Sequence, residues 1–121
     1  MAKLLIVDDE AHVRFTLREV LVDAGHDVVE ADGGAAALAC CDDDTDAVIT
    51  DLSMPGMDGS RLIREAKRRW PGLRTMLMTG LAADADSGLL KLADLLLRKP
   101  IEIGTLQRSL AQVLPPRIGA G

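Results

Sequence analysis

The chain has very few aromatic residues, with no tyrosine, one phenylalanine and one tryptophan among 121 residues. Its only two cysteines are adjacent, at Cys40 and Cys41, a spacing that suits neither the usual zinc-binding pairs nor a bridge between them. No apolar run approaches the roughly 20 residues of a membrane span, so we expect no membrane partner. About half of the residues are apolar (48%), which is enough for a hydrophobic core that needs no disulfide or metal ion to stabilise it.

Positive charge is also scarce, because 14 Lys and Arg residues stand against 19 Asp and Glu residues, for a net charge of −5. This balance disfavours nucleic acid or an anionic membrane surface as a partner. Met1 to Lys3 lead directly into an apolar run, which is not the pattern of a signal peptide, and reduced cysteines fit a reducing compartment. We expect one cytoplasmic domain over residues 1–114 and a flexible tail over residues 115–121.

Short apolar runs alternate with longer stretches whose apolar residues have helical spacing, which predicts βα units. The expected strands are Leu4–Val7, Val28–Ala31, Ala47–Thr50, Thr75–Met78 and Leu95–Leu97. Because these runs are almost continuously apolar, they indicate a parallel sheet covered on both faces. Helices are expected after Asp9 as far as Gly25, over 33–41, 60–69 and 82–93, and after Pro100. In the first helix, Arg14 and Arg18 are expected to face solvent.

Polar side chains stand at the ends of four of these runs. Asp8 and Asp9 follow the first run, Asp51 the third, Thr79 the fourth, and Lys99 comes just after the fifth. The carboxyl ends of strands in an open parallel sheet form its ligand-binding crevice, so these side chains are expected to meet there. Converging carboxylates recruit a hard divalent cation such as Mg²⁺. One carboxylate could then attack phosphorus while a hydroxyl and an ammonium group hold the phosphoryl oxygens, which predicts an aspartyl phosphate.

Four segments of the chain resemble the signatures of the response-regulator receiver family. They are LLIVDDE at residues 4–10, DLSMPGMDG at 51–59, MTG at 78–80 and RKP at 98–100. The resemblance spans residues 3 to about 114 and implies a flavodoxin-like α/β fold. Such a fold has a five-stranded parallel sheet in the order 2-1-3-4-5, with five helices distributed over both faces.

The resemblance also implies a role in a two-component or phosphorelay system. Asp51 would accept a phosphoryl group from a sensor histidine kinase or a histidine phosphotransfer protein. The ligands of the required Mg²⁺, or of a similar ion such as Mn²⁺, would be three carboxylates and one main-chain carbonyl, from Asp8, Asp9, Asp51 and Ser53. The domain would catalyse only its own phosphorylation and dephosphorylation, so it would not be an enzyme in the ordinary sense.

Thr79 and Lys99 would act as catalytic and switch residues, and the Lys99–Pro100 peptide bond would be cis. The output would be a change of the surface formed by the fourth helix, fifth strand and fifth helix, which would contact a downstream domain or protein. Leu96 stands where many receivers have an aromatic switch residue, and the segment from Thr79 to Lys99 is about two residues shorter than expected. The sequence does not specify the oligomeric state, and it is compatible with a homodimer.

Three alternatives remain at this stage. A magnesium-dependent phosphatase of the haloacid-dehalogenase kind also forms an aspartyl phosphate, but it needs a second carboxylate where this chain has Ser53. A flavin-binding protein of similar fold would need a phosphate loop rich in Ser, Thr and Gly after the first strand, and none is present. A receiver-shaped interaction module that is not phosphorylated would keep the fold without the chemistry.

Overall fold

A computed structural model of the chain describes residues 2–80 and 92–114, and the five expected strands all lie within these residues. They are β1 Lys3–Val7, β2 Asp27–Ala31, β3 Ala47–Asp51, β4 Arg74–Thr79 and β5 Leu95–Arg98. All neighbouring strands are parallel, and their order is β2-β1-β3-β4-β5, as expected. Each strand end lies within one residue of its expected position, because the apolar runs that mark the strands coincide with their buried parts.

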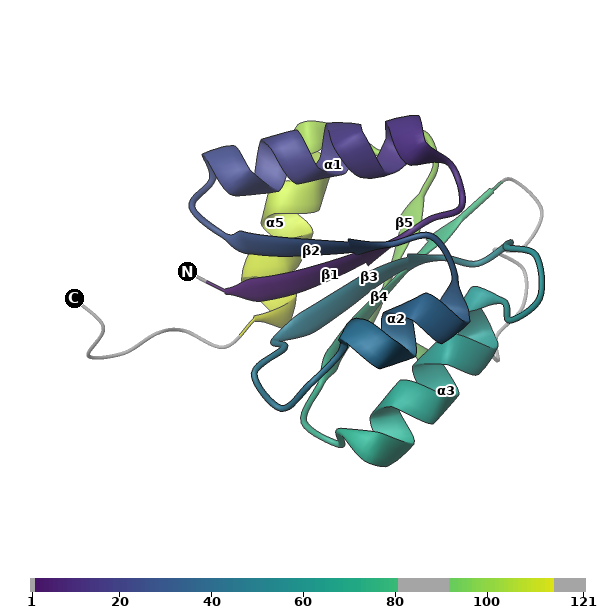
Figure 1. Cartoon of the computed structure of the whole chain (residues 1–121). Coiled ribbons are helices and arrows are strands. Elements are labelled where there is room, and N and C mark those ends of the chain that lie inside the picture. Colours follow the sequence, from purple (N-terminus) through teal and green to yellow (C-terminus); the bar gives the residue numbers. More distant parts are fainter. Residues whose placement is uncertain (1, 81–91, 115–121) are drawn as a thin grey trace.

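Four helices lie within the described residues: α1 Ala11–Asp23, α2 Gly34–Cys40, α3 Gly59–Arg69 and α5 Ile103–Val113. α1 and α5 cover one face of the sheet, and α2 and α3 cover the other (Figure 1). The expected helix at 82–93 lies almost entirely, and the expected tail at 115–121 wholly, outside the described residues, so a count of five helices is not confirmed. None of the described helices combines the length and apolar character needed to cross a membrane.

The core consists of apolar side chains on both sides of the sheet. Alternate residues of β1, such as Leu4 and Ile6, pack with Leu21 and Leu106 under α1 and α5. The residues between them, such as Leu5, pack under α2 and α3. All five residues of β3 are buried, so the central strand has no solvated face. This two-sided burial explains why the strands are apolar at nearly every position rather than at every second one.

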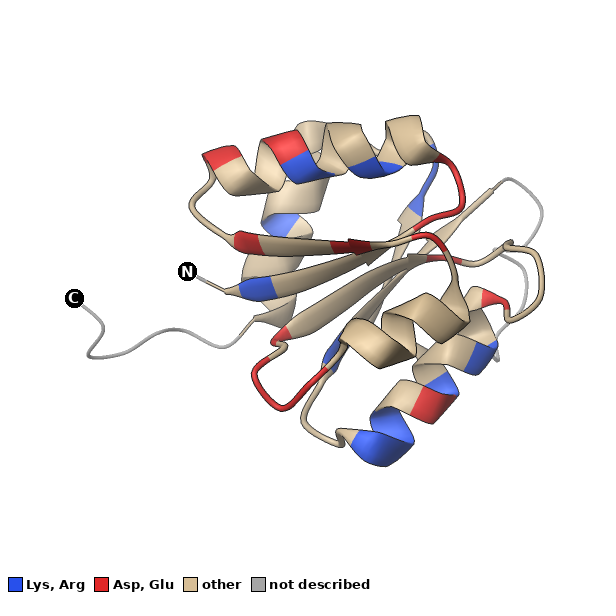
Figure 2. Ribbon diagram, in the orientation of Figure 1, with Lys and Arg blue, Asp and Glu red and all other residues tan. Residues whose placement is uncertain are grey.

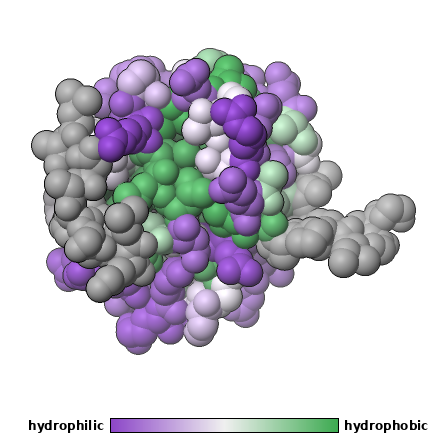
Figure 3. Space-filling model, turned by 180° about the vertical axis from the view of Figure 1, so that it is seen from behind, coloured by the Kyte–Doolittle hydropathy of each residue, from purple (hydrophilic) through white to green (hydrophobic). Residues whose placement is uncertain are grey.

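β5 forms one edge of the sheet. Figure 3, which views the molecule from behind, shows hydrophobic surface near the centre of this side. In β5, Leu97 is buried while Leu95 and Leu96 are only partly buried. Leu96 packs against a small cluster formed by Ile63, Leu77 and Ala93. The edge strand therefore contributes one side chain to the core and leaves two leucines partly exposed among the described residues.

Candidate functional site

The carboxyl ends of β1, β3, β4 and β5 bring the expected polar side chains together. Asp8 follows β1 directly, Asp51 is the last residue of β3, Thr79 is the last residue of β4, and Lys99 follows β5. The parallel register places Asp51 beside Met78, one residue before Thr79. Acidic segments gather at this end of the sheet in Figure 2.

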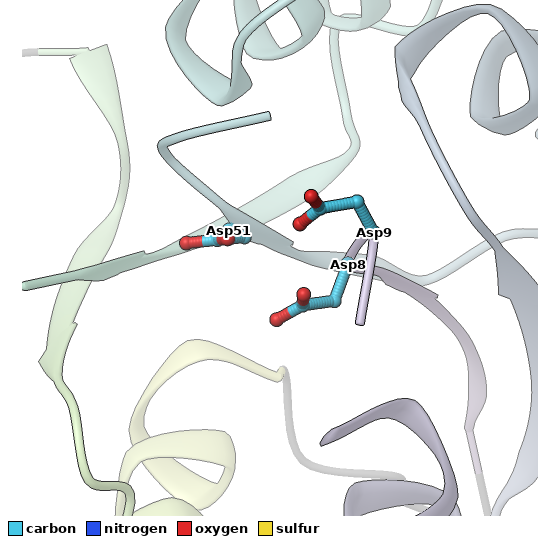
Figure 4. A group of neighbouring side chains, drawn as sticks. All are labelled: Asp8, Asp9 and Asp51. Atoms are coloured by element: carbon cyan, nitrogen blue, oxygen red, sulfur yellow. The ribbon is translucent and has the colours of Figure 1, made fainter. Parts of the chain in front are cut away.

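The carboxylates of Asp8, Asp9 and Asp51 form a cluster in which one oxygen from each lies within 4.8 Å of the others. Those of Asp8 and Asp9 point toward the end of β3, where Asp51 lies (Figure 4). Asp8 is fully buried and Asp51 is 6% exposed, whereas Asp9 is open to solvent. An oxygen-rich cluster with one open side fits a hard divalent cation that keeps part of its water shell.

Lys99 supplies the positive charge at this site. Its Nζ lies 3.2 Å from Asp8 Oδ2 and 3.2 Å from Asp51 Oδ1. Burial raises the pKa of the Asp51 carboxyl above its ordinary value, and the hydrogen bond and charge of Lys99 only partly offset this rise. Burial alone would lower the pKa of Lys99, but its hydrogen bond to Asp51 and the charges of Asp51 and Asp8 raise it. Lys99 therefore stays protonated and compensates the acidic cluster.

Thr79 is buried at the site, whereas Ser53 is exposed to solvent. Thr79 is 1% exposed, and its Oγ1 has no hydrogen-bond partner within the part of the chain that the structure describes. Since buried hydroxyl groups are nearly always paired, this one is available to a ligand. Ser53 is exposed, and its backbone hydrogen bond lowers the pKa of Asp51. The Lys99–Pro100 peptide bond is cis.

Arg14 was expected to face solvent, and this expectation is wrong. Its side chain is 18% exposed, and its Nη1 donates a hydrogen bond of 2.6 Å to the main-chain oxygen of Asp8. A helical periodicity places the Cβ of a residue, but it does not show where a long side chain ends. A signal that could have indicated this contact is Glu30, a carboxylate between the apolar residues Val29 and Ala31 of β2, which lies 3.4 Å from Arg14 Nε.

The start of α3 packs directly against the end of β3. A Cβ atom at Gly59 would lie 2.9 Å from Leu52 Cα, and it would be closer still to the main-chain oxygen of Asp51. Asp58 caps the helix by accepting a hydrogen bond of 2.9 Å from the backbone N–H of Arg61. The Gly59 N–H also donates to Leu52 O at 2.8 Å. Glycine is required here because α3 approaches the backbone that carries Asp51.

The fold is that of the receiver domains among solved structures. The sequence model of the response regulator receiver domain matches residues 4–111, which is most of the chain. The chain therefore belongs to the response regulator receiver family, whose members act in two-component signal transduction.

Known proteins illustrate the likeness. The chain is 39% identical over 83 residues to the response regulator protein FleR of Pseudomonas aeruginosa, covering 68% of this chain and 18% of FleR. It spans between 18% and 36% of the length of three such curated relatives. The chemotaxis response regulator CheY4 of Vibrio cholerae has a TM-score of 0.84 and 30% identity, with 94% of this chain and 99% of that chain covered. The response regulator TrrA of Thermotoga maritima, in complex with Mg(2+)-BeF, has a TM-score of 0.83 and 28% identity, with coverages of 94% and 100%.

Proposed function

We propose that this chain is a phosphoacceptor that takes a phosphoryl group onto Asp51 in a Mg²⁺-dependent reaction. The observation that carries the proposal is the position of Lys99 Nζ, 3.2 Å from carboxylate oxygens of both Asp8 and Asp51. At the end of the neighbouring strand, the buried Thr79 hydroxyl has no hydrogen-bond partner among the described residues. This arrangement offers a nucleophilic carboxylate, a cation site and two groups suited to phosphoryl oxygens. Phosphoryl transfer depends mainly on such positioning and charge compensation.

Each residue has a separate part in this reaction. The Asp51 carboxylate attacks phosphorus, and the bond from phosphorus to the donor atom breaks as the Asp51–phosphorus bond forms. The metal ion, Mg²⁺ or a similar ion such as Mn²⁺, would be held by the carboxylates of Asp8, Asp9 and Asp51 and by the main-chain carbonyl of Ser53. When bound, the ion neutralises phosphoryl oxygens and favours the ionised form of the acceptor.

Lys99 and Thr79 complete the phosphoryl site. Lys99 exchanges its contact with Asp51 for a phosphoryl oxygen, and its charge is already in place because two carboxylates hold it there. The Thr79 hydroxyl donates to another phosphoryl oxygen, which gives this buried group a partner. Both interactions are absent before transfer, so they bias the ends of β4 and β5 toward a second conformation.

The phosphodonor we infer is a phosphohistidine of a sensor histidine kinase or of a histidine phosphotransfer protein. A groove of about 600 Å³ is lined mainly by apolar groups and shares Lys99 with the acceptor site. Its walls are formed by four residues of α1 and by the segment from Lys99 to Ile101, the helix residues being His12, Val13, Thr16 and Leu17. A donor helix lying there would contact Lys99, which also contacts Asp51. We place this reaction in the cytoplasm, with residues 1–114 as the domain that carries it.

The output surface we infer lies on β5 and α5, together with the expected helix at 82–93. A second groove, of about 570 Å³, runs between Leu96 and Arg98 on β5 and Thr105 and Ser109 on α5. Leu96 takes the place of an aromatic switch residue and is packed against Leu77. Phosphorylation would therefore act on this surface through a change in aliphatic packing, and the surface would bind a downstream domain or protein.

The decisive experiment is phosphorylation with acetyl phosphate and Mg²⁺, followed by intact-mass measurement. Wild type should gain one phosphoryl group, Asp51→Asn should gain none, and chelation of Mg²⁺ with EDTA should abolish the gain. Asp44→Asn, in an exposed acidic loop away from the site, serves as the matched control and should behave as wild type. A wild type without an adduct would support an unphosphorylated interaction module, and sustained turnover of a phosphomonoester would support a phosphatase.

A further inference from the structure

Asp8 is held at each of its polar groups. Its N–H donates to Ala31 O at 3.2 Å, and its Oδ1 accepts the N–H of Glu10 at 2.9 Å. Its Oδ2 accepts from Lys99 at 3.2 Å, and its main-chain oxygen accepts from Arg14 at 2.6 Å. The contact with Arg14 is the shortest of the four, and it comes from the first turn of α1. The turn that carries both Asp8 and Asp9 is thus fastened to the helix that follows it.

Arg14 is itself held by β2. Its Nε lies 3.4 Å from Glu30 Oε1, while Nη1 of the same guanidinium reaches Asp8. The planar guanidinium can serve two acceptors at once because its N–H groups point in different fixed directions. Arg18 lies 3.5 Å from the other oxygen of Glu30, but its side chain is 48% exposed, and this ion pair joins it to Glu30 rather than to Asp8. Only one of these two arginines therefore links the acidic strand residue to the site.

We propose that Arg14 is a positioning residue for the metal site, with Glu30 as its support. Through the main-chain oxygen of Asp8, the guanidinium fixes the turn from which the carboxylates of Asp8 and Asp9 reach the site. The inference rests on the proposed function in one respect, namely that a divalent cation binds to these carboxylates. Groups that orient metal ligands contribute strongly to affinity, and their removal typically weakens metal binding by about 10–100-fold.

The direction of the effect separates this role from simple electrostatics. Arg14 carries a positive charge near an acidic cluster, so removing that charge would by itself strengthen the binding of a cation. Loss of a positioning contact would instead weaken it. The two effects have opposite signs, which makes metal affinity more informative than stability. Arg18→Gln removes the same charge from the same helix and the same partner, so it is the matched control.

The experiment measures the binding of Mg²⁺ alone by titration calorimetry, and of Mn²⁺ by the electron paramagnetic resonance of the free ion. We expect Arg14→Gln to bind Mg²⁺ about tenfold more weakly than wild type. Arg18→Gln should bind as tightly as wild type or tighter. Arg14→Lys keeps the charge but lacks the planar guanidinium that can serve two acceptors, so it should recover only part of the lost Mg²⁺ affinity. Glu30→Gln leaves Arg14 in place but weakens its support, and it should give an intermediate affinity.

Thermal denaturation followed by circular dichroism checks that each variant folds, and Glu30→Gln keeps the test decisive if Arg14→Gln does not. Equal Mg²⁺ affinity in Arg14→Gln and Arg18→Gln would overturn the role of Arg14. A wild type that binds Mg²⁺ but accepts no phosphoryl group from acetyl phosphate would overturn the proposed function and leave the role of Arg14 standing. A wild type that binds no Mg²⁺ would overturn both.

Discussion

Substitution of Gly59 by alanine tests the packing on which the position of Asp51 depends. The new Cβ would lie 2.9 Å from both Leu52 Cα and Leu77 Cδ1, and closer still to the Asp51 main-chain oxygen. Leu77 is fully buried and packs with Ile63 and Ala93, so it has little room to move. The other two neighbours are backbone atoms of β3 and of the residue that follows it. Relief of the contact therefore requires α3 to move away from β3.

The expected cost follows from two opposing effects. Overpacking of a tight core site costs about 1–3 kcal/mol. Alanine in place of glycine contributes up to about 1 kcal/mol in a helix interior, and less in a first turn such as this. We expect Gly59→Ala to lower the free energy of unfolding by about 1–2 kcal/mol. Because the same movement displaces the segment after Asp51, phosphorylation by acetyl phosphate should also be slower.

Urea denaturation measures this change, with the fluorescence of Trp70, the single tryptophan, and far-UV circular dichroism as two probes. Gly72→Ala is the matched control, since no atom lies within 4 Å of a Cβ at that position. It should change the free energy of unfolding by less than about 0.5 kcal/mol. Equal stability of Gly59→Ala and Gly72→Ala would refute the claim that α3 is pressed against β3 at this point.

Three further predictions concern stability. Asp94 accepts the Thr75 N–H at 2.8 Å and pairs with Lys67 at 3.3 Å; burial would raise its pKa, but these contacts outweigh burial and lower it. Its contribution is therefore present above the unfolded-state pKa and is lost as the pH falls through the lower folded-state pKa. Asp94→Asn should cost about 1 kcal/mol at pH 7 in urea denaturation, and this cost should shrink as the pH falls through the folded-state pKa of Asp94. Asp58→Ala removes the cap of α3 and should cost about 1 kcal/mol at pH 7. Mg²⁺ at ten times its Kd should stabilise wild type by about 1.4 kcal/mol in thermal denaturation, and Asp9→Asn should lose this gain.

Each of these three has a clear contrary result. A cost of Asp94→Asn that stays constant from pH 7 to pH 2 would contradict the assigned pKa shift. Asp58→Asn keeps a capping oxygen, so a loss equal to that of Asp58→Ala would mean that the cap is not responsible. Stabilisation by Mg²⁺ that persists in Asp9→Asn would place the ion somewhere other than the proposed site.

The strands and the polar residues at their carboxyl ends could be predicted from the sequence. Each buried position of a strand requires an apolar residue, so the strand appears in the sequence as an apolar run. Apolar runs marked all five strands to within one residue, and the residues after them marked the site. Asp51 and Thr79, expected just after their strands, are in fact the last residues of β3 and β4. The helix expected at 82–93, rich in weak helix formers, lies almost wholly outside the described residues.

By itself, the sequence determined which residues stand at the strand ends and, through the family signatures, which family the chain belongs to. Only the tertiary structure showed that Lys99 contacts both Asp8 and Asp51, that Thr79 Oγ1 has no partner among the described residues, and that Arg14 turns back to Asp8. The physical reason is the distance along the chain between the residues that interact. Strand burial depends on local sequence, whereas these contacts join residues from different strands and helices, and the reach of a long side chain depends on packing that no local pattern records.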